Sequence, residues 1–189
     1  MSSSSRCAAP ERRRLLCAAA LVALTPAAHA QVAPPPEVAL DLPGAKLLGQ
    51  GTLRWLGLRV YDAVLWSRTP LTAADAVNAP LALELRYARR LKGPLIAERS
   101  LDEMRRQGPI DDDNARRWLA AMTGLFPDVD EGDRITGIQR PGVGARFHVN
   151  GRLSGELADP QFARRFFGIW LSDSTSEPAL RSALLGTRP

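Results

Sequence analysis

The chain has 189 residues, of which 45% are hydrophobic and 24% charged, and its formal net charge is +5. No dense Lys/Arg cluster alternates with aromatic residues, so the composition gives no support to nucleic-acid binding. Both cysteines, Cys7 and Cys17, lie in the first thirty residues, and the remainder keeps a single histidine, His148. Beyond residue 30 the sequence therefore excludes a disulfide, a thiolate nucleophile and a cysteine-based zinc site.

The first thirty residues have the pattern of an export signal. Arginines at 12–14 precede an apolar run over 15–25, and Pro26 and the triplet Ala28-His29-Ala30 follow it. This run is too short to span a bilayer, which needs about twenty residues, but it suits a signal peptide with a small-residue cleavage site. We expect cleavage after Ala30 and a periplasmic or secreted protein. General secretion fits better than the twin-arginine route, which stays open.

Removal of residues 1–30 leaves 159 residues with 21 basic and 19 acidic side chains, a net charge of only +2. That length is enough for one domain with its own core. We divide the chain into a signal peptide (1–30), an extended Pro-rich lead (31–37) and a single domain (38–189). We expect no transmembrane segment after signal removal, and nothing in the pattern implies a cofactor or a metal.

Strands dominate the first half of the expected domain. Residues 38–42 read as a strand that ends at Pro43-Gly44, and a hairpin rich in Leu, Val, Trp and Tyr follows over 47–67. A single helical turn is possible over 72–77. Residues 81–87 alternate apolar and polar side chains, which predicts a half-buried strand.

Two helices are predicted next. The first covers 95–107, follows a tolerated first-turn proline, and spaces Asp102 and Arg106 for an ion pair. The second is capped by residues 111–114 and runs to about Leu125 with one continuous apolar stripe.

The end of the chain repeats this order of strands and then helices. Strands are predicted over 133–139, 145–150 and 152–157, the last two joined by Asn150-Gly151, a strong hairpin signal. Asp159-Pro160 opens a helix in the favoured cap-then-proline order, and a last helix is predicted near 177–185. The order predicts an α+β fold, with an antiparallel sheet and the helices on one side.

Motifs along residues 38–186 together resemble the chalcone isomerase-like family. They are Gly49-x-Gly51, Val60-Tyr61-x-Ala63, Leu91-Lys92-Gly93, Phe126-Pro127-Asp128, the Asn-Gly hairpin and the ending Phe166-Phe167-Gly168-Ile169-Trp170-Leu171-Ser172. The resemblance implies an open-faced antiparallel sheet with helices packed on one side and an apolar cleft between the two layers.

The same resemblance implies a ligand site that is largely altered here. In the family's enzymes a strand arginine after Gly-x-Gly polarises the ligand. Counted from Gly49, that position holds Leu53, and Arg54 comes one residue late. A one-residue offset turns a strand side chain to the other face unless a bulge intervenes.

The other family positions also differ. The threonine, tyrosine and asparagine positions hold Tyr61, Ile96 and Glu103, and the last hydroxyl has a counterpart at Thr175 or its neighbours. Chalcone cyclisation needs preorganised donors for a phenolate, whereas Ile96 donates nothing and an ionised Glu103 repels an anion. The resemblance thus argues for the fold and against that activity.

Three functions remain open. An exported, non-catalytic protein can bind a fatty acid or other small apolar ligand, as the family's fatty-acid-binding branch implies, with an acid head near Arg54. An isomerase- or lyase-type enzyme can use Arg54, Tyr61 and Glu103 in the same cleft. An envelope interaction module can instead fill the cleft with its own aromatic residues. The candidate ligand-binding residues are Arg54, Tyr61, Ile96, Glu103 and Thr175, and no catalytic residue is assigned.

Two further clusters have simpler interpretations. The aromatic residues of 162–170 can line a pocket but are more typical of helix packing. The acidic residues of 128–133 hint at calcium, yet they lack the loop pattern with a late Glu ligand and favour a solvated turn. For His148 we expect a structural role.

Overall fold

The computed structural model describes residues 32–72 and 74–187, and these belong to one compact unit. The expected signal peptide lies outside the described residues. Within the described part, no helix is long and apolar enough to cross a membrane.

Six antiparallel strands form one sheet whose spatial order follows the chain. They are β1 (Lys46–Trp55), β2 (Leu58–Ser67), β3 (Leu81–Tyr87), β4 (Arg134–Arg140), β5 (Gly144–Val149) and β6 (Arg152–Leu157). The predicted hairpin and the later strands are confirmed to within one or two residues. Asn150 and Gly151 join β5 to β6 with φ of 50° and 81°, the left-handed pair that a tight hairpin turn requires.

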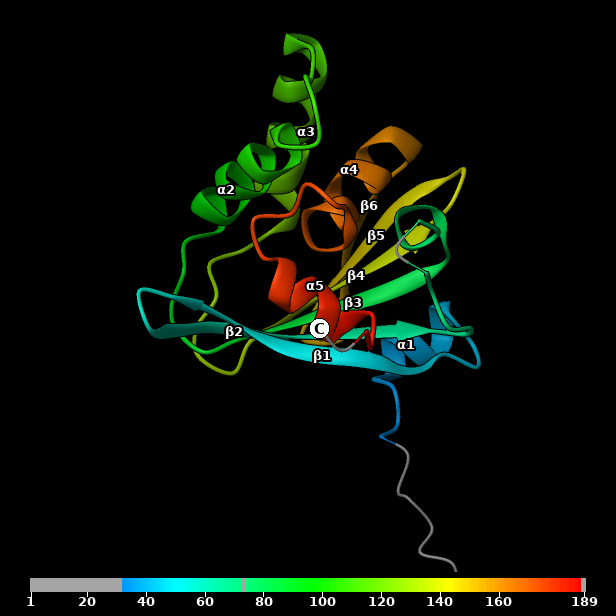
Figure 1. The fold of residues 1–189 in the computed structure, drawn as a ribbon. Helices are drawn as coiled ribbons and strands as arrows, with labels where there is room; N and C mark the ends of the chain where they lie inside the picture. Colours follow the sequence, from blue (N-terminus) through cyan, green and yellow to red (C-terminus); the bar gives the residue numbers. More distant parts are fainter. Residues whose placement is uncertain (1–31, 73, 188–189) are drawn as a thin grey trace, which may run out of the picture. The chain divides into compact units, whose positions relative to one another are not determined.

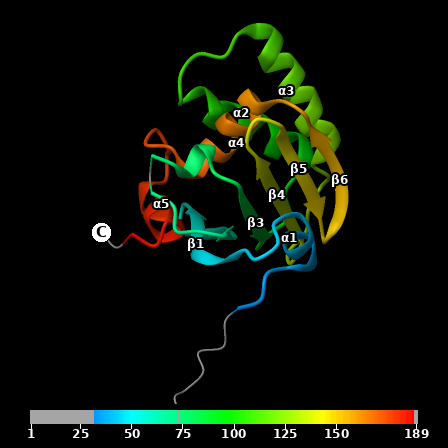
Figure 2. The same ribbon diagram turned by 90° about the vertical axis from the view of Figure 1, so that its right-hand side faces the viewer.

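Four α-helices cover one face of this sheet (Figures 1 and 2). They are α2 (Gly93–Arg105), α3 (Asp112–Leu125), α4 (Pro160–Leu171) and α5 (Pro178–Leu184), and a short 3-10 turn, η1 (Ala76–Asn78), lies in the connector before β3. Asp111 and Asp159 cap α3 and α4 by accepting from backbone N–H groups, as predicted. The arrangement confirms the α+β fold class. On α2, however, Asp102 pairs with Arg105 rather than Arg106.

The main core lies between the helices and the sheet. Phe147 of β5 is fully buried there, with edge-on contacts to Phe126, Phe162 and Phe166 at ring-centroid distances of 5.2, 6.3 and 5.1 Å. Edge-to-face contacts of this kind add to the stability gained by burial. Much of the aromatic cluster at 162–170 is therefore packing, as its helical spacing indicates.

The strand predicted over 38–42 is wrong, because this segment forms helix α1 (Pro36–Asp41). Val38, Leu40 and Leu42 alternate like a strand, but Val38 and Leu42 are also four residues apart and face one side of a helix. Both are buried, whereas Leu40 is 76% exposed. The predicted extended lead over 31–37 is likewise interrupted, since the helix begins at Pro36, where a first-turn proline is favoured.

Helix α1 packs on the face of the sheet opposite the other helices (Figures 1 and 2). Val38 and Leu42 form a second small core with Trp66, Ala82 and Ile138. This cover explains why β3 is buried on both faces and not half-buried as predicted, with even Glu84 only 3% exposed.

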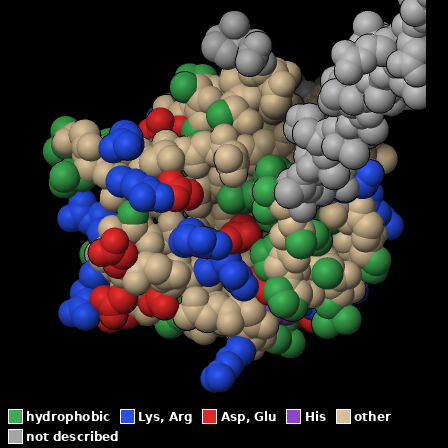
Figure 3. All heavy atoms as spheres, turned by 90° about the horizontal axis from the view of Figure 1, so that it is seen from below, with side chains coloured by type: hydrophobic (Ala, Val, Ile, Leu, Met, Phe, Trp, Pro, Cys, Tyr) green, Lys and Arg blue, Asp and Glu red, His purple; other side chains and the backbone are tan. Residues whose placement is uncertain are grey.

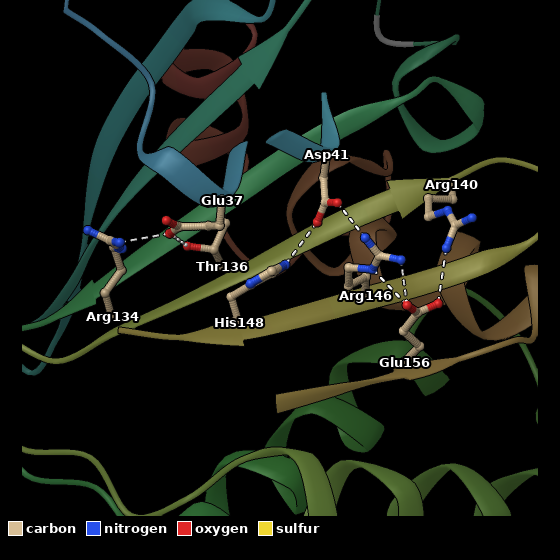
Figure 4. A network of polar contacts seen from close by, with 8 residues as sticks. All are labelled: Glu37, Asp41, Arg134, Thr136, Arg140, Arg146, His148 and Glu156. Carbon is tan, nitrogen blue, oxygen red and sulfur yellow. Dashed lines mark hydrogen bonds and ion pairs between the residues drawn. The ribbon is translucent and has the colours of Figure 1, made fainter. Parts of the chain in front are cut away.

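Polar contacts fix α1 to strands β4 and β5 (Figure 4). The buried carboxylate of Glu37 accepts hydrogen bonds from Arg134 Nη2 at 2.7 Å and Thr136 Oγ1 at 3.0 Å. Asp41 Oδ2 lies 2.9 Å from His148 Nε2, and Arg146 bridges Asp41 to Glu156. His148 thus has the structural surroundings expected of it.

Glycines at 49 and 51 admit α5 against β1. A Cβ on Gly49 would lie 2.2 Å from the carbonyl oxygen of Ala183, and one on Gly51 would lie 2.6 Å from Leu180 Cδ1. The Gly-x-Gly motif therefore serves close packing of helix on strand.

Candidate ligand-binding cavity

A cavity of about 390 Å³ lies between the sheet and the helices, in the size range of small-molecule sites. The sheet supplies one wall, helices α2 and α4 supply the other, and the segment before α5 closes the rim. Its lining residues include Leu53, Val60, Tyr61, Leu85, Tyr87 and Ile135 from the sheet, Ile96, Arg99, Ser100 and Glu103 from α2, Phe166, Ile169 and Trp170 from α4, and Ser176 and Glu177. Most of this surface is apolar.

Tyr61 is the main polar group on the sheet side. Trp170 Nε1 donates a hydrogen bond of 2.9 Å to the Tyr61 hydroxyl oxygen, which leaves the hydroxyl hydrogen available. No acceptor for that hydrogen is found among the described residues. Burial raises the pKa of Tyr61 well above its ordinary value, against the lowering effect of the Trp170 hydrogen bond. Tyr61 is therefore a neutral donor at physiological pH.

Glu103 is the acidic group on the helix side. Its side chain is almost fully buried, with Oε1 at 2.5 Å from Arg99 Nη2 and Oε2 at 3.5 Å from Arg106 Nε. Arg99 lines the cavity beside it. Pairing with two guanidinium groups compensates the cost of burying this carboxylate, so the α2 wall carries a charge pair and not an isolated charge.

Arg54 is not among the residues that line the cavity. Its side chain is exposed and its Nη1 donates to the carbonyl oxygen of Gly57 at 3.4 Å, whereas the neighbouring Leu53 lines the cavity. The pairing of β1 with β2 shifts after Leu53, so the extra residue, Val60, lies on β2. The bulge exists, but it does not return Arg54 to the position that the family's enzymes give to arginine.

Thr175 also lies outside the lining. Its Oγ1 accepts from the backbone N–H of Glu177 at 3.1 Å, just before α5, and the next two residues reach the rim instead. Of the five candidate residues, the structure brings together Tyr61, Ile96 and Glu103.

The sequence reasoning missed the two arginines of the site, Arg89 and Arg99. Arg99 lies three residues after Ile96 and four before Glu103, so helical spacing alone places the three on one face. Arg89 carries no such signal, because it lies in the loop after β3.

The aromatic residues of 162–170 and the acidic residues of 128–133 both have the simpler roles predicted for them, in large part. Phe166 and Trp170 line the cavity, while Phe162 and Phe167 are buried in the core. The aromatic residues therefore leave the cleft open, whereas an interaction module was expected to fill it with its own side chains.

The acidic turn is held by basic partners. Asp128 accepts a hydrogen bond from Lys92 Nζ at 2.7 Å, and this contact lowers the pKa of Asp128. Residues 32–72 and 74–187 contain no cluster of three or more His, Cys, Asp or Glu arranged for a metal ion.

An open six-stranded antiparallel sheet, layered with helices over an apolar cavity, defines an α+β protein of the chalcone isomerase-like fold. The sequence matches the chalcone isomerase-like family over residues 27–186, and the chain belongs to that family. No curated protein matches the sequence.

Among solved structures, the chain is similar to a fatty-acid binding protein of Arabidopsis thaliana. The TM-score is 0.60 at 16% sequence identity, and the match covers 76% of this chain and 87% of that protein. At this identity, the similarity supports the fold.

Proposed function

We propose that the protein is exported and binds, without catalysis, a fatty acid or another small apolar molecule in the cavity between sheet and helices. The cavity itself carries the proposal, because about 390 Å³ of largely apolar space suits an alkyl chain or a small ring system. The fatty-acid binding function of the Arabidopsis protein on the same fold supports it.

The polar groups of the cavity favour binding over catalysis. Leu53 occupies the position of the arginine that polarises ligand in the family's enzymes, and Arg54 lies outside. Tyr61 stays protonated at neutral pH because burial raises its pKa, so no phenolate is present to act as a base, and Glu103 is paired with two arginines. An enzyme that uses Arg54, Tyr61 and Glu103 together would need these groups to converge, and Arg54 does not join the other two.

An acid head group on the ligand would find its charge partner at the rim. Of the two arginines that line the cavity, Arg99 is paired with Glu103, whereas Arg89 is exposed and has no acidic partner among the described residues. We therefore place a carboxylate near Arg89 and not near Arg54, with the alkyl chain toward Leu85 and Ile135.

The test is native mass spectrometry of the full chain, expressed in a bacterium and purified without detergent. Wild-type protein should carry an adduct that leaves on denaturation and extracts into organic solvent. Ile96→Trp should fill the cavity and lose the adduct, while Leu153→Trp, at an exposed site outside the lining, should keep it. A clean mass for the wild type, with no thermal shift on addition of fatty acids, would overturn the proposal.

Export needs its own measurement. The mass of the protein in the periplasmic fraction should correspond to a chain that begins at Gln31. Full-length protein confined to the cytoplasm would contradict the export part of the proposal and leave the ligand part standing.

A further inference from the structure

The turn of the β1–β2 hairpin exposes a group of large apolar side chains. Trp55 is 59% exposed, Leu56 86% and Leu58 56%, and Leu95 in the first turn of α2 is similarly exposed. These four, here called the apolar tip, make up half of the exposed large hydrophobic residues in the described part. Isolated exposed apolar residues are ordinary, but a contiguous group marks a contact surface.

The apolar tip lies at the mouth of the cavity. Trp55 and Leu95 both line the cavity, and Trp55 pairs with Leu58 across the hairpin. Figure 1 shows this hairpin projecting beyond the rest of the sheet, toward the side where α2 begins. A surface that contacts the tip would therefore also contact the opening through which a ligand enters.

Conformational needs of the turn do not explain Leu56. Leu56 and Gly57 have φ of 49° and 80°, the left-handed pair of a tight hairpin turn in which Asn-Gly is favoured. A leucine in this conformation is strained as well as exposed. The Asn150-Gly151 turn of the same sheet shows the ordinary choice, so the leucine at 56 is a departure that stability does not favour.

Basic residues without acidic partners flank the tip. Arg54 precedes Trp55, and Arg89 lines the cavity rim; neither forms an ion pair among the described residues. Nearby Arg59 and Arg90 are paired with Asp62 and Asp130, so Arg54 and Arg89 are the arginines beside the tip that have no acidic partner among the described residues. Figure 3 shows hydrophobic side chains at the end of the molecule to which this hairpin projects, with Lys and Arg beside them and Asp and Glu among these.

We propose that the apolar tip docks on an anionic phospholipid bilayer and brings the mouth of the cavity to the membrane. A tryptophan and leucines flanked by arginines match the interface of such a bilayer, where apolar side chains enter between head groups and cations meet anionic lipid. The docking rests on the tip and on the two arginines beside it, and it does not depend on the proposed function. Combined with the proposed function, it gives an apolar ligand a path between membrane and cavity that avoids water.

Trp55 provides an internal probe for the test. The other three tryptophans, Trp66, Trp118 and Trp170, are buried, and none occurs in residues 1–31. Vesicles of phosphatidylcholine with phosphatidylglycerol should shift the Trp55 emission to shorter wavelength and protect it from acrylamide. Vesicles of phosphatidylcholine alone should bind more weakly, by about fivefold for each arginine that contacts the surface.

Matched variants of the full chain distinguish vesicle binding through the tip from vesicle binding through the N-terminal segment, because every variant has the same N-terminal segment. Leu56→Ser with Leu58→Ser should reduce flotation with anionic vesicles at least about tenfold. The control, Leu40→Ser with Leu153→Ser, removes two exposed leucines elsewhere and should float like the wild type. Because neither Leu56 nor Leu58 lines the cavity, the tip variant should keep any adduct seen in the native mass spectrum.

Three results would overturn the membrane proposal. The first is equal flotation of the tip variant and its control. The second is an unchanged Trp55 emission in the presence of anionic vesicles. The third is a doubled mass in light scattering without vesicles that the tip variant abolishes, since this would assign the tip to a second copy of the chain. If the wild-type protein carries no adduct but still floats with anionic vesicles, the proposed ligand binding is rejected and the membrane docking stands.

Discussion

The indole Nε1 of Trp170 lies 2.9 Å from the hydroxyl oxygen of Tyr61 and donates a hydrogen bond to it. This contact joins α4 to β2 across the edge of the cavity. The Tyr61 oxygen thus accepts a hydrogen bond from within the protein, and the Tyr61 hydroxyl hydrogen remains available to donate to a ligand. The pair is therefore part of the fold as well as part of the proposed site.

Tyr61→Phe should destabilise the protein by about 1–2 kcal/mol, because Trp170 Nε1 would remain buried without an acceptor. Tyr87→Phe is the matched control. Tyr87 is equally an aromatic residue of the cavity wall, but its hydroxyl forms no hydrogen bond within the described residues, so its loss should change stability by less than about 0.5 kcal/mol. Urea unfolding of both variants decides, and equal effects would contradict the role of the Trp170 contact.

Alkaline pH should unfold the protein through its two tyrosines. Burial raises the pKa of both Tyr61 and Tyr87 above the ordinary 10.0. Below about pH 10 both states keep these protons, so stability is unaffected; above it the unfolded chain releases them first, and stability falls by about 1.4 kcal/mol per pH unit for each tyrosine. The sequence has only two lysines, Lys46 and Lys92, so few other groups titrate there. Tyrosinate absorbance should rise together with the loss of circular dichroism; a rise near pH 10 in folded protein would refute the expectation.

Leu53→Arg should increase the affinity for a fatty-acid anion by about tenfold, because it places a guanidinium in the cavity where the family's enzymes carry one. Arg54→Ala should leave that affinity within about twofold, since Arg54 lies outside the lining. Calorimetric titration with dodecanoate measures both, and thermal unfolding confirms that each variant is folded. A marked loss in Arg54→Ala would return Arg54 to the site.

Local patterns predicted most of the fold because they match the contacts that each element makes. Asp159-Pro160 predicts the start of a helix and Asn150-Gly151 predicts a hairpin turn, each from two adjacent residues. Helix α1 could not be predicted in this way. Val38, Leu40 and Leu42 fit the period of a strand, while Val38 and Leu42 by themselves also fit one face of a helix, and their contact with the sheet decides between the two.

The site was predictable only in part, for a related reason. Family positions named Tyr61, Ile96 and Glu103, and all three line the cavity. The direction of Arg54 depends on where the pairing of β1 with β2 shifts, which is a contact between two strands and not a property of either.

Gly49→Ala should destabilise the protein by more than about 2 kcal/mol, because its Cβ would meet backbone oxygens of α5 that cannot move independently. Gly124→Ala is the matched control. Its Cβ would meet nothing within 4 Å, and as a position in α3 it should gain up to about 0.5–1 kcal/mol from helix propensity. Opposite signs in urea unfolding are expected, and a neutral Gly49→Ala would contradict the packing role of the Gly-x-Gly motif.

Glu37→Ala should release α1 from the sheet. The carboxylate is 3% exposed and accepts from Arg134 and Thr136. Its removal leaves the partly buried Arg134 guanidinium with only the longer 4.0 Å contact to Glu84 and the buried Thr136 hydroxyl without its acceptor, at a cost of about 2–4 kcal/mol. Leu40→Ala, on the exposed side of the same helix, should cost less than about 0.5 kcal/mol. Hydrogen exchange of the α1 amides distinguishes local from global loss: Glu37→Ala should speed their exchange more than that of β5, and equal protection of α1 in both variants would show that packing of Val38 and Leu42 holds the helix without Glu37.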